Sequence, residues 1–555
     1  MGIFRYFRYI TTNYPSCFTT IKKTYKNRDT TLNSDTKGVE CVLFDLNALI
    51  HPCFQEVFEY GSDVKVSFLL QQRKSGMTYQ ELEKMAFNLL TKKIEEHIYY
   101  IKPTKAIYIA IDGVAGSSKS NQQRQRRFKN ALNPATNKYG FDPNSITCGT
   151  DLMDRLCKHI FFFIRRKKES DWKNLKVVYS DMYVAGEGEN KLKLWIESEP
   201  YRSVTIVSPD GDVIMLALLL NKDEVYIFRQ NVFTDIPGDY FFVDIMKLKT
   251  SLFFKLGGEC VDKVLEQPQK VINDYVLFHF FIGNDFLPHM SSIEIDNKGI
   301  EMLYKCYNET FTESGYLIEE RLSKININKN AFMTLVNKLA NYEIKMLIDK
   351  CKKKVSWPDK ILMDNILRTT EGNNLNFTQY RKDYYIKKLK FNHSDDNPAI
   401  LEKQIKAMCE EYILGLNFVL RYYFRSIPTY SWHYPYHYSP LLVDLAKYAK
   451  EISFEPVFEV RPALSIYESL FGILPLQCFN LLPEEIVKGL DSKIKLDSDF
   501  STDFTIDLDG KVYEYEGICI LPFLSYDKIK RYFKNIKLTP ERVDKLARRT
   551  KVYNF

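Results

Sequence analysis

Short apolar runs recur through the first half of the chain, and many of them end at an acidic side chain. Their length and their content of β-branched residues predict buried strands at residues 41–44, 106–111, 177–179, 204–207 and 225–228. Helical patterns precede or follow them at residues 78–100, 119–132, 151–163, 191–197 and 271–282. Strands that alternate with helices in this way predict an α/β fold with a parallel sheet.

The second half of the chain is patterned differently. Residues 300–400 are rich in Lys and Asn and predict a helical, variable connector, whereas residues 406–425 form an amphipathic helical pattern. Strand-like runs near Thr505 and Gly517 precede a basic helical end. We therefore expect an α/β part at 1–300, a connector at 301–400 and a part at 401–555 that packs on the first.

Acidic side chains gather where the predicted elements of the first part end. They are Asp45, Asp112, Glu187, Glu189, Asp210, Asp212 and Asp285. A single Asp at a strand end is most often a helix N-cap, but ligands bind beyond the carboxyl ends of parallel strands, where several of these acids would meet. Such a cluster needs cations or protons to offset its repulsion, and oxygen ligands favour Mg²⁺ or Mn²⁺. Two ions ~3.5–4 Å apart could promote hydrolysis of a phosphodiester.

A basic helix follows the second acid. Residues 119–129 contain five cations and no acid, and Lys119, Gln123, Arg126 and Arg127 fall on one helical face. A solvated basic face is the usual explanation for a charge run, but a phosphate held by charge-assisted hydrogen bonds is favoured here by the nearby acid. Residues 116–120 do not form a Walker loop, because no Gly-Lys-Ser/Thr closes them.

Composition narrows the class of protein. The net charge of +8 is small for 555 residues, so any nucleic-acid footprint must be local. The eleven cysteines form no C-x-x-C pair, which argues against a zinc ribbon and favours a reducing compartment. No apolar run approaches the length of a membrane span, and residues 1–10 form neither a signal peptide nor a complete myristoylation site.

Taken together, these motifs resemble the XRN family of 5′→3′ exoribonucleases. The resemblance rests on segments 1–10, 44–51, 111–115 with 121–124, 186–189, 208–212, 283–288, 432–440 and 517–523. It covers nearly all of the chain except about 300–400. This sequence departs from the family pattern at Gly116–Ser118, where Pro-Arg-Ala is usual, and at Asn190, which replaces a His. Tyr430 and Tyr515 stand where the family has Trp.

The resemblance implies a PIN/flap-nuclease-like parallel sheet flanked by helices and completed by a mainly helical second conserved region. It implies that the seven acids are catalytic metal ligands, and that Lys119, Gln123, Arg126 and Arg127 bind a 5′-monophosphate. His51 and Trp432 would stack on bases. His433 and His437 have the i, i+4 spacing of zinc ligands, but Pro435 between them argues against a helix, so we expect aromatic packing there.

The expected function is processive, Mg²⁺- or Mn²⁺-dependent hydrolysis of single-stranded, 5′-monophosphorylated RNA to 5′-mononucleotides. We expect a monomeric, cytoplasmic protein with no membrane partner, in a compact form that lacks the family's accessory C-terminal domains. Nuclear and viral-factory placement and protein partners stay open. Two alternatives also stay open: a flap- or DNA-directed 5′ nuclease on the same acids, and a catalytically silent RNA-binding scaffold.

Overall fold

The structure is a computed structural model of the 555-residue chain, which divides into two compact units. Unit 1 comprises residues 1–14, 248–460 and 504–523, and unit 2 comprises residues 15–247, 461–503 and 524–555. Each unit is described by itself. The described residues are 5–21, 38–61, 74, 76–132, 139–231, 239–257, 267–295, 298–321, 324–370, 372–394, 396–490, 494, 497–547 and 552–555. The first four residues of the N-terminal motif therefore lie outside them.

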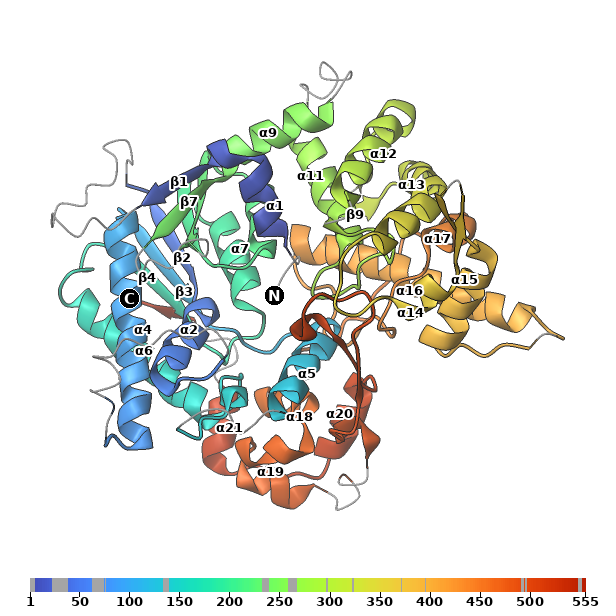
Figure 1. The fold of residues 1–555 in the computed structure, drawn as a ribbon. Helices are drawn as coiled ribbons and strands as arrows, with labels where there is room; N and C mark the ends of the chain where they lie inside the picture. The colour runs from blue at the N-terminus through green and yellow to red at the C-terminus, as the bar shows by residue number, and fades with distance from the viewer. Residues whose placement is uncertain are drawn as a thin grey trace. The chain divides into compact units, whose positions relative to one another are not determined.

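Unit 2 is built on a mixed sheet in which the described residues form eight strands, in the order β1-β7-β6-β5-β2-β3-β4-β14 (Figure 1). The strands are β1 (Phe18–Ile21), β2 (Cys41–Asp45), β3 (Ala106–Ala110), β4 (Lys176–Ser180), β5 (Ser203–Val207), β6 (Glu224–Gln230), β7 (Tyr240–Asp244) and β14 (Tyr553–Asn554). Neighbours from β6 through β5, β2 and β3 to β4 pair in parallel, as predicted. Strands β1, β7 and β14 pair antiparallel at the edges.

The order of the strands creates a switch point beside β2. From β2 the chain proceeds outward through β3 and β4, and then crosses to β5 on the other side of β2. Strands β4 and β5 therefore run parallel without being neighbours, because β3 and β2 lie between them. Ligands of open α/β sheets bind at such a switch point, beyond the carboxyl ends of the strands. Here those ends carry Asp45 and the segment after β5.

Helices cover both faces of the sheet, as the alternation of side chains along β2 shows. Val42 and Phe44 belong to the core that contains the helices on one face, and Leu43 lies with Leu192 and Val213 on the other. The helices of unit 2 around the sheet are α2 (Asn47–Phe58), α4 (Tyr79–Ile101), α6 (Asp151–Lys168), α7 (Gly188–Ser198) and α8 (Asp212–Leu219). Helix α4 begins at a capping box between Thr78 and Glu81.

The basic helix α5 (Ser117–Leu132) is held by the late part of the chain that belongs to unit 2. It packs against α18 (Ile466–Ile473), which in turn contacts α20 (Tyr526–Phe533) (Figure 1). The fully buried guanidinium of Arg124 donates to the carbonyl oxygens of Gly472, at 3.1 Å, and Asp499. Arg124 therefore anchors the helix. Helices α19 (Glu484–Gly489) and α21 (Pro540–Leu546) complete this part.

Unit 1 is mainly helical. Its helices are α1 (Tyr6–Asn13), most of α9 (Ile245–Gly257), α11 (Pro268–His279), α12 (Gly299–Ser314), α13 (Lys329–Cys351), α14 (Lys360–Asp364), α15 (Phe377–Asp383), α16 (Ala399–Phe424) and α17 (Leu442–Ala449). Its strands pair antiparallel as β8 (Ile318–Arg321) with β9 (Lys324–Ile327), β10 (Ile366–Thr369) with β11 (Gly372–Leu375), and β12 (Thr505–Asp507) with β13 (Ile518–Ile520). The strands expected near Thr505 and Gly517 are thus confirmed.

The segment expected to be a helical connector, 300–400, also contains strands β8 to β11. The buried carboxylate of Asp274 accepts hydrogen bonds from the backbone N–H groups of Leu317 and Ile318, at 2.9 and 3.0 Å, and so ties the start of β8 to α11. These contacts join residues more than forty positions apart, which a local pattern does not reveal. Within the described part of the chain, no helix combines the length and apolarity needed to cross a bilayer.

Candidate active site

The carboxyl ends of β2 and β5 carry the centre of the candidate site. Asp45 is the last residue of β2 and is only 6% exposed. The Ser208 hydroxyl, just after β5, donates to Asp45 Oδ2 at 3.2 Å and accepts the backbone N–H of Asp210 at 3.3 Å. Ser208 therefore links Asp45 to the turn that carries Asp210. The sequence alone indicates Ser208 only as part of the motif at 208–212.

The turn after β3 places Asp112 beside the start of α7. Asp112 Oδ1 accepts the backbone N–H of Gly188 at 2.6 Å, and the Asp112 N–H donates to Asn47 Oδ1 at 3.0 Å. The two loops are also joined by backbone hydrogen bonds, from Gly113 N to Gly186 O and from Gly186 N to Val114 O, both at 2.9 Å. The loop that carries Asp112 and the loop that carries Glu187 are thus held together by backbone hydrogen bonds.

Glycine is required in this turn for two different physical reasons. Gly186 has φ of +105°, a region that L side chains rarely adopt. Gly188 has no such torsion, but a Cβ there would stand 2.8 Å from Asp45 Oδ1 and 3.2 Å from Asp112 Oδ1. The backbone therefore approaches both carboxylates at the closest distance that the atoms allow.

Electrostatics confirms that four of the predicted acids lie near one another. The pKa of Asp45 is raised well above its ordinary value, first by burial and then by the negative charges of Asp112, Asp210 and Glu187. Repulsion of this kind favours the protonated form until a cation offsets it.

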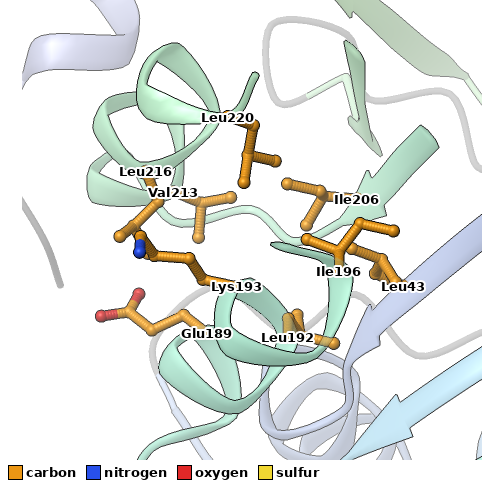
Figure 2. Close-up of a pocket in the computed structure, with 9 residues that line it drawn as sticks. All are labelled: Leu43, Glu189, Leu192, Lys193, Ile196, Ile206, Val213, Leu216 and Leu220. Atoms are coloured by element: carbon orange, nitrogen blue, oxygen red, sulfur yellow. The ribbon is translucent and has the colours of Figure 1, made fainter. Parts of the chain in front are cut away.

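Glu189 and Asp212 take different positions. Glu189, in the first turn of α7, lines an otherwise apolar cavity of about 10 Å³ together with Lys193, Val213 and Leu216 (Figure 2). Figure 2 shows the carboxylate of Glu189 beside the amino group of Lys193, at the end of the cavity away from Leu220. Asp212 is the first residue of α8 and is buried. Their part in the acidic group stays a prediction.

A lysine of the basic helix reaches the acids directly. Lys119 lies in the first turn of α5, and its ammonium forms an ion pair with Oε1 of Glu187. The two side chains are 10% and 9% exposed, so the pair is almost completely shielded from water. The structure thus brings a predicted phosphate ligand and a predicted metal ligand together.

The remaining predicted phosphate ligands are half-buried on the same helix. Arg127 donates to the hydroxyl of Thr147 at 3.0 Å, and burial together with the charge of Arg126 lowers its pKa to about 10. The Arg127 guanidinium is therefore charged at neutral pH. Gln123 lies one turn before them.

His51 of α2 lies close enough to these cations for them to affect its titration. Its pKa is lowered to about 4 by surrounding protein atoms and by the charges of Arg127 and Arg126, against an opposing effect of Asp210. Its side chain retains solvent-exposed surface. His51 is thus a neutral ring at pH 7, and it lies near enough to Arg126, Arg127 and Asp210 for their charges to affect its pKa.

Lys191 is a site residue that sequence reasoning missed. Its buried ammonium donates to the carbonyl oxygens of Ile111 and Asp181, at 2.7 and 2.9 Å, and so bridges the ends of β3 and β4. Burial lowers its pKa to about 8, against the opposing charge of Asp112. The one available signal was its place two residues after Glu189. The side chain of Asp181 accepts the N–H of Tyr183 at 2.9 Å and so stabilises the turn after β4.

Two predicted site residues belong to unit 1. The side chain of Asn284 accepts the N–H groups of Phe286 and Leu287, both at 2.9 Å, and this fixes the turn that carries Asp285. The half-buried Trp432 packs on Phe418, with ring centroids 4.7 Å apart. The positions of Asp285 and Trp432 relative to the acids of unit 2 stay predictions.

The neighbouring histidines of unit 1 pack as expected. Residues 430–440 form no helix, and the rings of His433 and His437 stack on Phe523 at centroid distances of 5.6 and 4.6 Å. His437 also lies within hydrogen-bonding distance of the carbonyl oxygen of Leu521. These contacts confirm the expected aromatic packing.

The donor set of unit 2 fits a hard divalent cation. Asp45, Asp112, Glu187 and Asp210 supply carboxylate oxygens, the ligands that Mg²⁺ and Mn²⁺ prefer, and burial followed by the negative charges of the other three raises the pKa of Asp45. Even so, no group of three or more His, Cys, Asp or Glu side chains in the described ranges is arranged closely enough to hold an ion. The acids would have to close around a cation.

Comparison with known proteins assigns the chain to a family. Residues 1–231 match the family model "XRN 5'-3' exonuclease N-terminus", and residues 267–376 and 372–552 match "Xrn1 helical domain". Among similar proteins are human 5'-3' exoribonuclease 1, 26% identical, and the Schizosaccharomyces pombe protein of the same name, 24% identical, each over 95% of this chain. The Drosophila melanogaster 5'-3' exoribonuclease 2 homolog is 25% identical over 99% of this chain and 72% of its own length.

The first two relatives are much longer proteins, since the matches cover 34% and 48% of their lengths. The chain thus spans about a third to a half of these relatives. Both family models together match most of its residues, and the second alone matches about half. The chain belongs to the XRN family of 5′–3′ exonucleases.

Proposed function

We propose that this protein is a 5′→3′ exoribonuclease that degrades single-stranded, 5′-monophosphorylated RNA processively to 5′-mononucleotides with Mg²⁺ or Mn²⁺. The observation that carries this proposal is the contact between Lys119, at the start of a cationic helix, and Glu187, beside a group of carboxylates. A 5′-phosphate bound by α5 would lie close to the acids. Cleavage next to it would then release one nucleotide.

In this proposal the seven acids Asp45, Asp112, Glu187, Glu189, Asp210, Asp212 and Asp285 hold two ions. When bound, the ions would activate water and offset charge on the leaving oxygen. The protein's own contribution is to keep the oxygens in place. Ser208 orients Asp45, and the Gly188 N–H holds Asp112. Lys191 ties the ends of β3 and β4 together through the carbonyl oxygens of Ile111 and Asp181.

The cations of α5 recognise the end of the substrate. A 5′-monophosphate carries up to two negative charges, which Lys119, Arg126 and Arg127 can offset while Gln123 adds a neutral donor. A 5′-hydroxyl would forfeit these bonds, each worth ~1.5–3 kcal/mol. After every cleavage the new end again carries a monophosphate, so the same pocket serves the next step.

Aromatic side chains would hold the bases without regard to sequence. His51 is neutral at pH 7 and retains exposed ring surface beside the cations, so it can stack on a base near the phosphate. Trp432 would provide a second platform. We further propose that residues 1–300 form the nuclease part, that 401–555 complete the catalytic region and that 301–400 connect the two. We also propose that the protein acts as a cytoplasmic monomer.

The proposal is tested with end-labelled RNAs that differ only at the 5′ end. We expect 5′-monophosphate RNA to yield mononucleotides in Mg²⁺, and 5′-hydroxyl, triphosphorylated and circular RNA to resist. Arg126→Ala should remove the preference for the monophosphate, whereas Lys129→Ala, which removes one cation from the same helix, should keep it. Cutting of circles would indicate an endonuclease, preference for DNA flaps a flap nuclease, and binding without hydrolysis a silent scaffold.

A further inference from the structure

The ion pair between Lys119 and Glu187 joins two groups that the proposed function gives different tasks. Lys119 would bind the 5′-phosphate of the substrate, and Glu187 would bind a cation. In the structure each satisfies the other, so neither is ready for its own ligand. We infer that Lys119 is a specificity-determining residue that serves as a counter-charge for Glu187 until a divalent cation replaces it and frees it for the 5′-phosphate. This inference rests on the proposed function.

The physical reason is burial. Both side chains are about nine-tenths shielded, and removing one partner of a buried pair leaves an uncompensated charge that is strongly destabilising. Glu187 also lies near Asp45, whose other acidic neighbours are Asp112 and Asp210, so its carboxylate needs a positive partner. Lys191 is committed to two backbone carbonyls, which leaves Lys119 as the cation that the structure pairs with Glu187.

A change in charge then couples the two ligands. The four carboxylates and the two buried lysines carry a formal charge of −2, which becomes −3 when Lys119 leaves, so departure of the lysine favours the entry of divalent cations. A bound cation, in turn, offsets Glu187 and repels the ammonium. The displaced Lys119 needs a new anion, and a terminal phosphate supplies it.

Cation and 5′-phosphate should therefore bind cooperatively. By linkage the effect is reciprocal: the factor by which a cation tightens the phosphorylated RNA equals the factor by which that RNA tightens the cation. An RNA with a 5′-hydroxyl offers no anion at this position and should show little coupling. Preference for the monophosphate would then depend on cation occupancy, in addition to the shape of the pocket.

Binding measurements test this without any catalysis. Mn²⁺ binding to the RNA-free protein is measured by titration calorimetry for wild type, Lys119→Met and the control Lys129→Met. We expect Lys119→Met to bind Mn²⁺ about 10-fold more tightly, within the usual range of coupling between sites, and Lys129→Met to match wild type. Unchanged Mn²⁺ affinity in a folded Lys119→Met protein would overturn the inference.

The second measurement uses a decamer with 2′-O-methyl phosphorothioate linkages, checked to remain intact, with either a 5′-phosphate or a 5′-hydroxyl. In wild type, Mn²⁺ should tighten the phosphorylated decamer about 10-fold more than the hydroxyl form, and Lys119→Met should lose this difference. Equal tightening of both decamers by Mn²⁺ in wild type would contradict the coupling.

A third variant covers the case in which Lys119→Met does not fold. Glu187→Gln breaks the pair from the other side and leaves the lysine in place, so metal-free binding of the phosphorylated decamer should become tighter than in wild type. Weaker or unchanged binding would count against the inference. Failure of the proposed function is separate, because wild type would then not prefer 5′-monophosphate RNA in the hydrolysis assay at all.

Discussion

Gly188 gives the sharpest test of how the acids are positioned. It is the first residue of α7, and its N–H donates to Asp112 at 2.6 Å. In Gly188→Ala the new Cβ would meet Asp45 Oδ1 at 2.8 Å and Asp112 Oδ1 at 3.2 Å. Both atoms are the ends of side chains, so they can move aside by some tenths of an ångström. The substitution should thus displace two carboxylates while the backbone stays in place.

The effects on activity and on stability should differ in size. Misplacement of catalytic groups by ~1 Å can lower a rate by ~10²-fold, so a shift of a few tenths of an ångström in both acids should lower kcat by about 10- to 100-fold. Stability should change little, because alanine is favoured over glycine in a helix by ~1 kcal/mol and this offsets part of the strain. We therefore expect low kcat, a KM near that of wild type and a similar Tm.

Single-turnover decay of 5′-phosphorylated RNA at saturating protein, together with a melting curve, measures both quantities. Leu194→Ala is the matched control, because it alters an exposed position of the same helix and should leave kcat unchanged. A Gly188→Ala protein with the rate of wild type would refute the reasoning that the glycine holds the two carboxylates at a catalytic distance. A large fall in Tm would show instead that the contact is mainly structural.

Three further changes test other parts of the molecule. Asp210→Asn should abolish hydrolysis while RNA binding survives, since the acid would hold a cation that acts on the transition state; near-normal turnover at saturating Mg²⁺ would show that Asp210 is not a metal ligand. Trp432→Ala should weaken RNA engagement by roughly 10- to 150-fold if the ring stacks on a base, and unchanged single-turnover decay would assign stacking elsewhere. Burial raises the pKa of Glu343 to about 7 from 4.5, although it accepts the N–H groups of Leu442 and Val443. The folded state then holds this proton more tightly than the unfolded chain. The free energy of unfolding should therefore fall as the pH rises from 4.5 to 7, by on the order of 3 kcal/mol. Glu343→Gln should flatten the pH dependence of Tm across this window, and an unchanged profile would contradict the assignment.

The sequence predicts the sheet and the location of the acids because both follow from local rules. An apolar run of five residues that ends in an acid, as at β2, can be recognised without knowledge of the rest of the chain. Parallel strands then bring their carboxyl ends to one edge, so Asp45, Asp112 and Asp210 are expected together. The structure agrees, since Asp112 and Asp210 raise the pKa of Asp45.

The supporting groups are not predictable in this way. Ser208, Asn47 and Lys191 act through hydrogen bonds to residues as far as 163, 65 and 80 positions away, and their own spacing carries no signal of these partners. The order of the strands decides which residues meet, and a local pattern does not contain that order. Strands β8 to β11 within 300–400 were also not predicted, although β8 pairs with β9 and β10 with β11 as local hairpins. The Lys119–Glu187 pair also joins motifs that the sequence presents as separate.

These supporting groups also explain how the fold tolerates several acids near one another. Buried carboxylates that repel one another destabilise the folded state, and the raised pKa of Asp45 reflects that cost. Backbone hydrogen bonds between the 113–114 and 186 segments do not depend on charge, so they hold the loops together whatever the occupancy of the site. Lys191 adds a fixed positive charge, whereas Lys119 can exchange its partner. The site therefore combines uncharged backbone hydrogen bonds with one ion pair, that of Lys119 with Glu187. In the mechanism that we infer, the hydrogen bonds keep the loops folded at any cation concentration, and the ion pair changes when a cation binds.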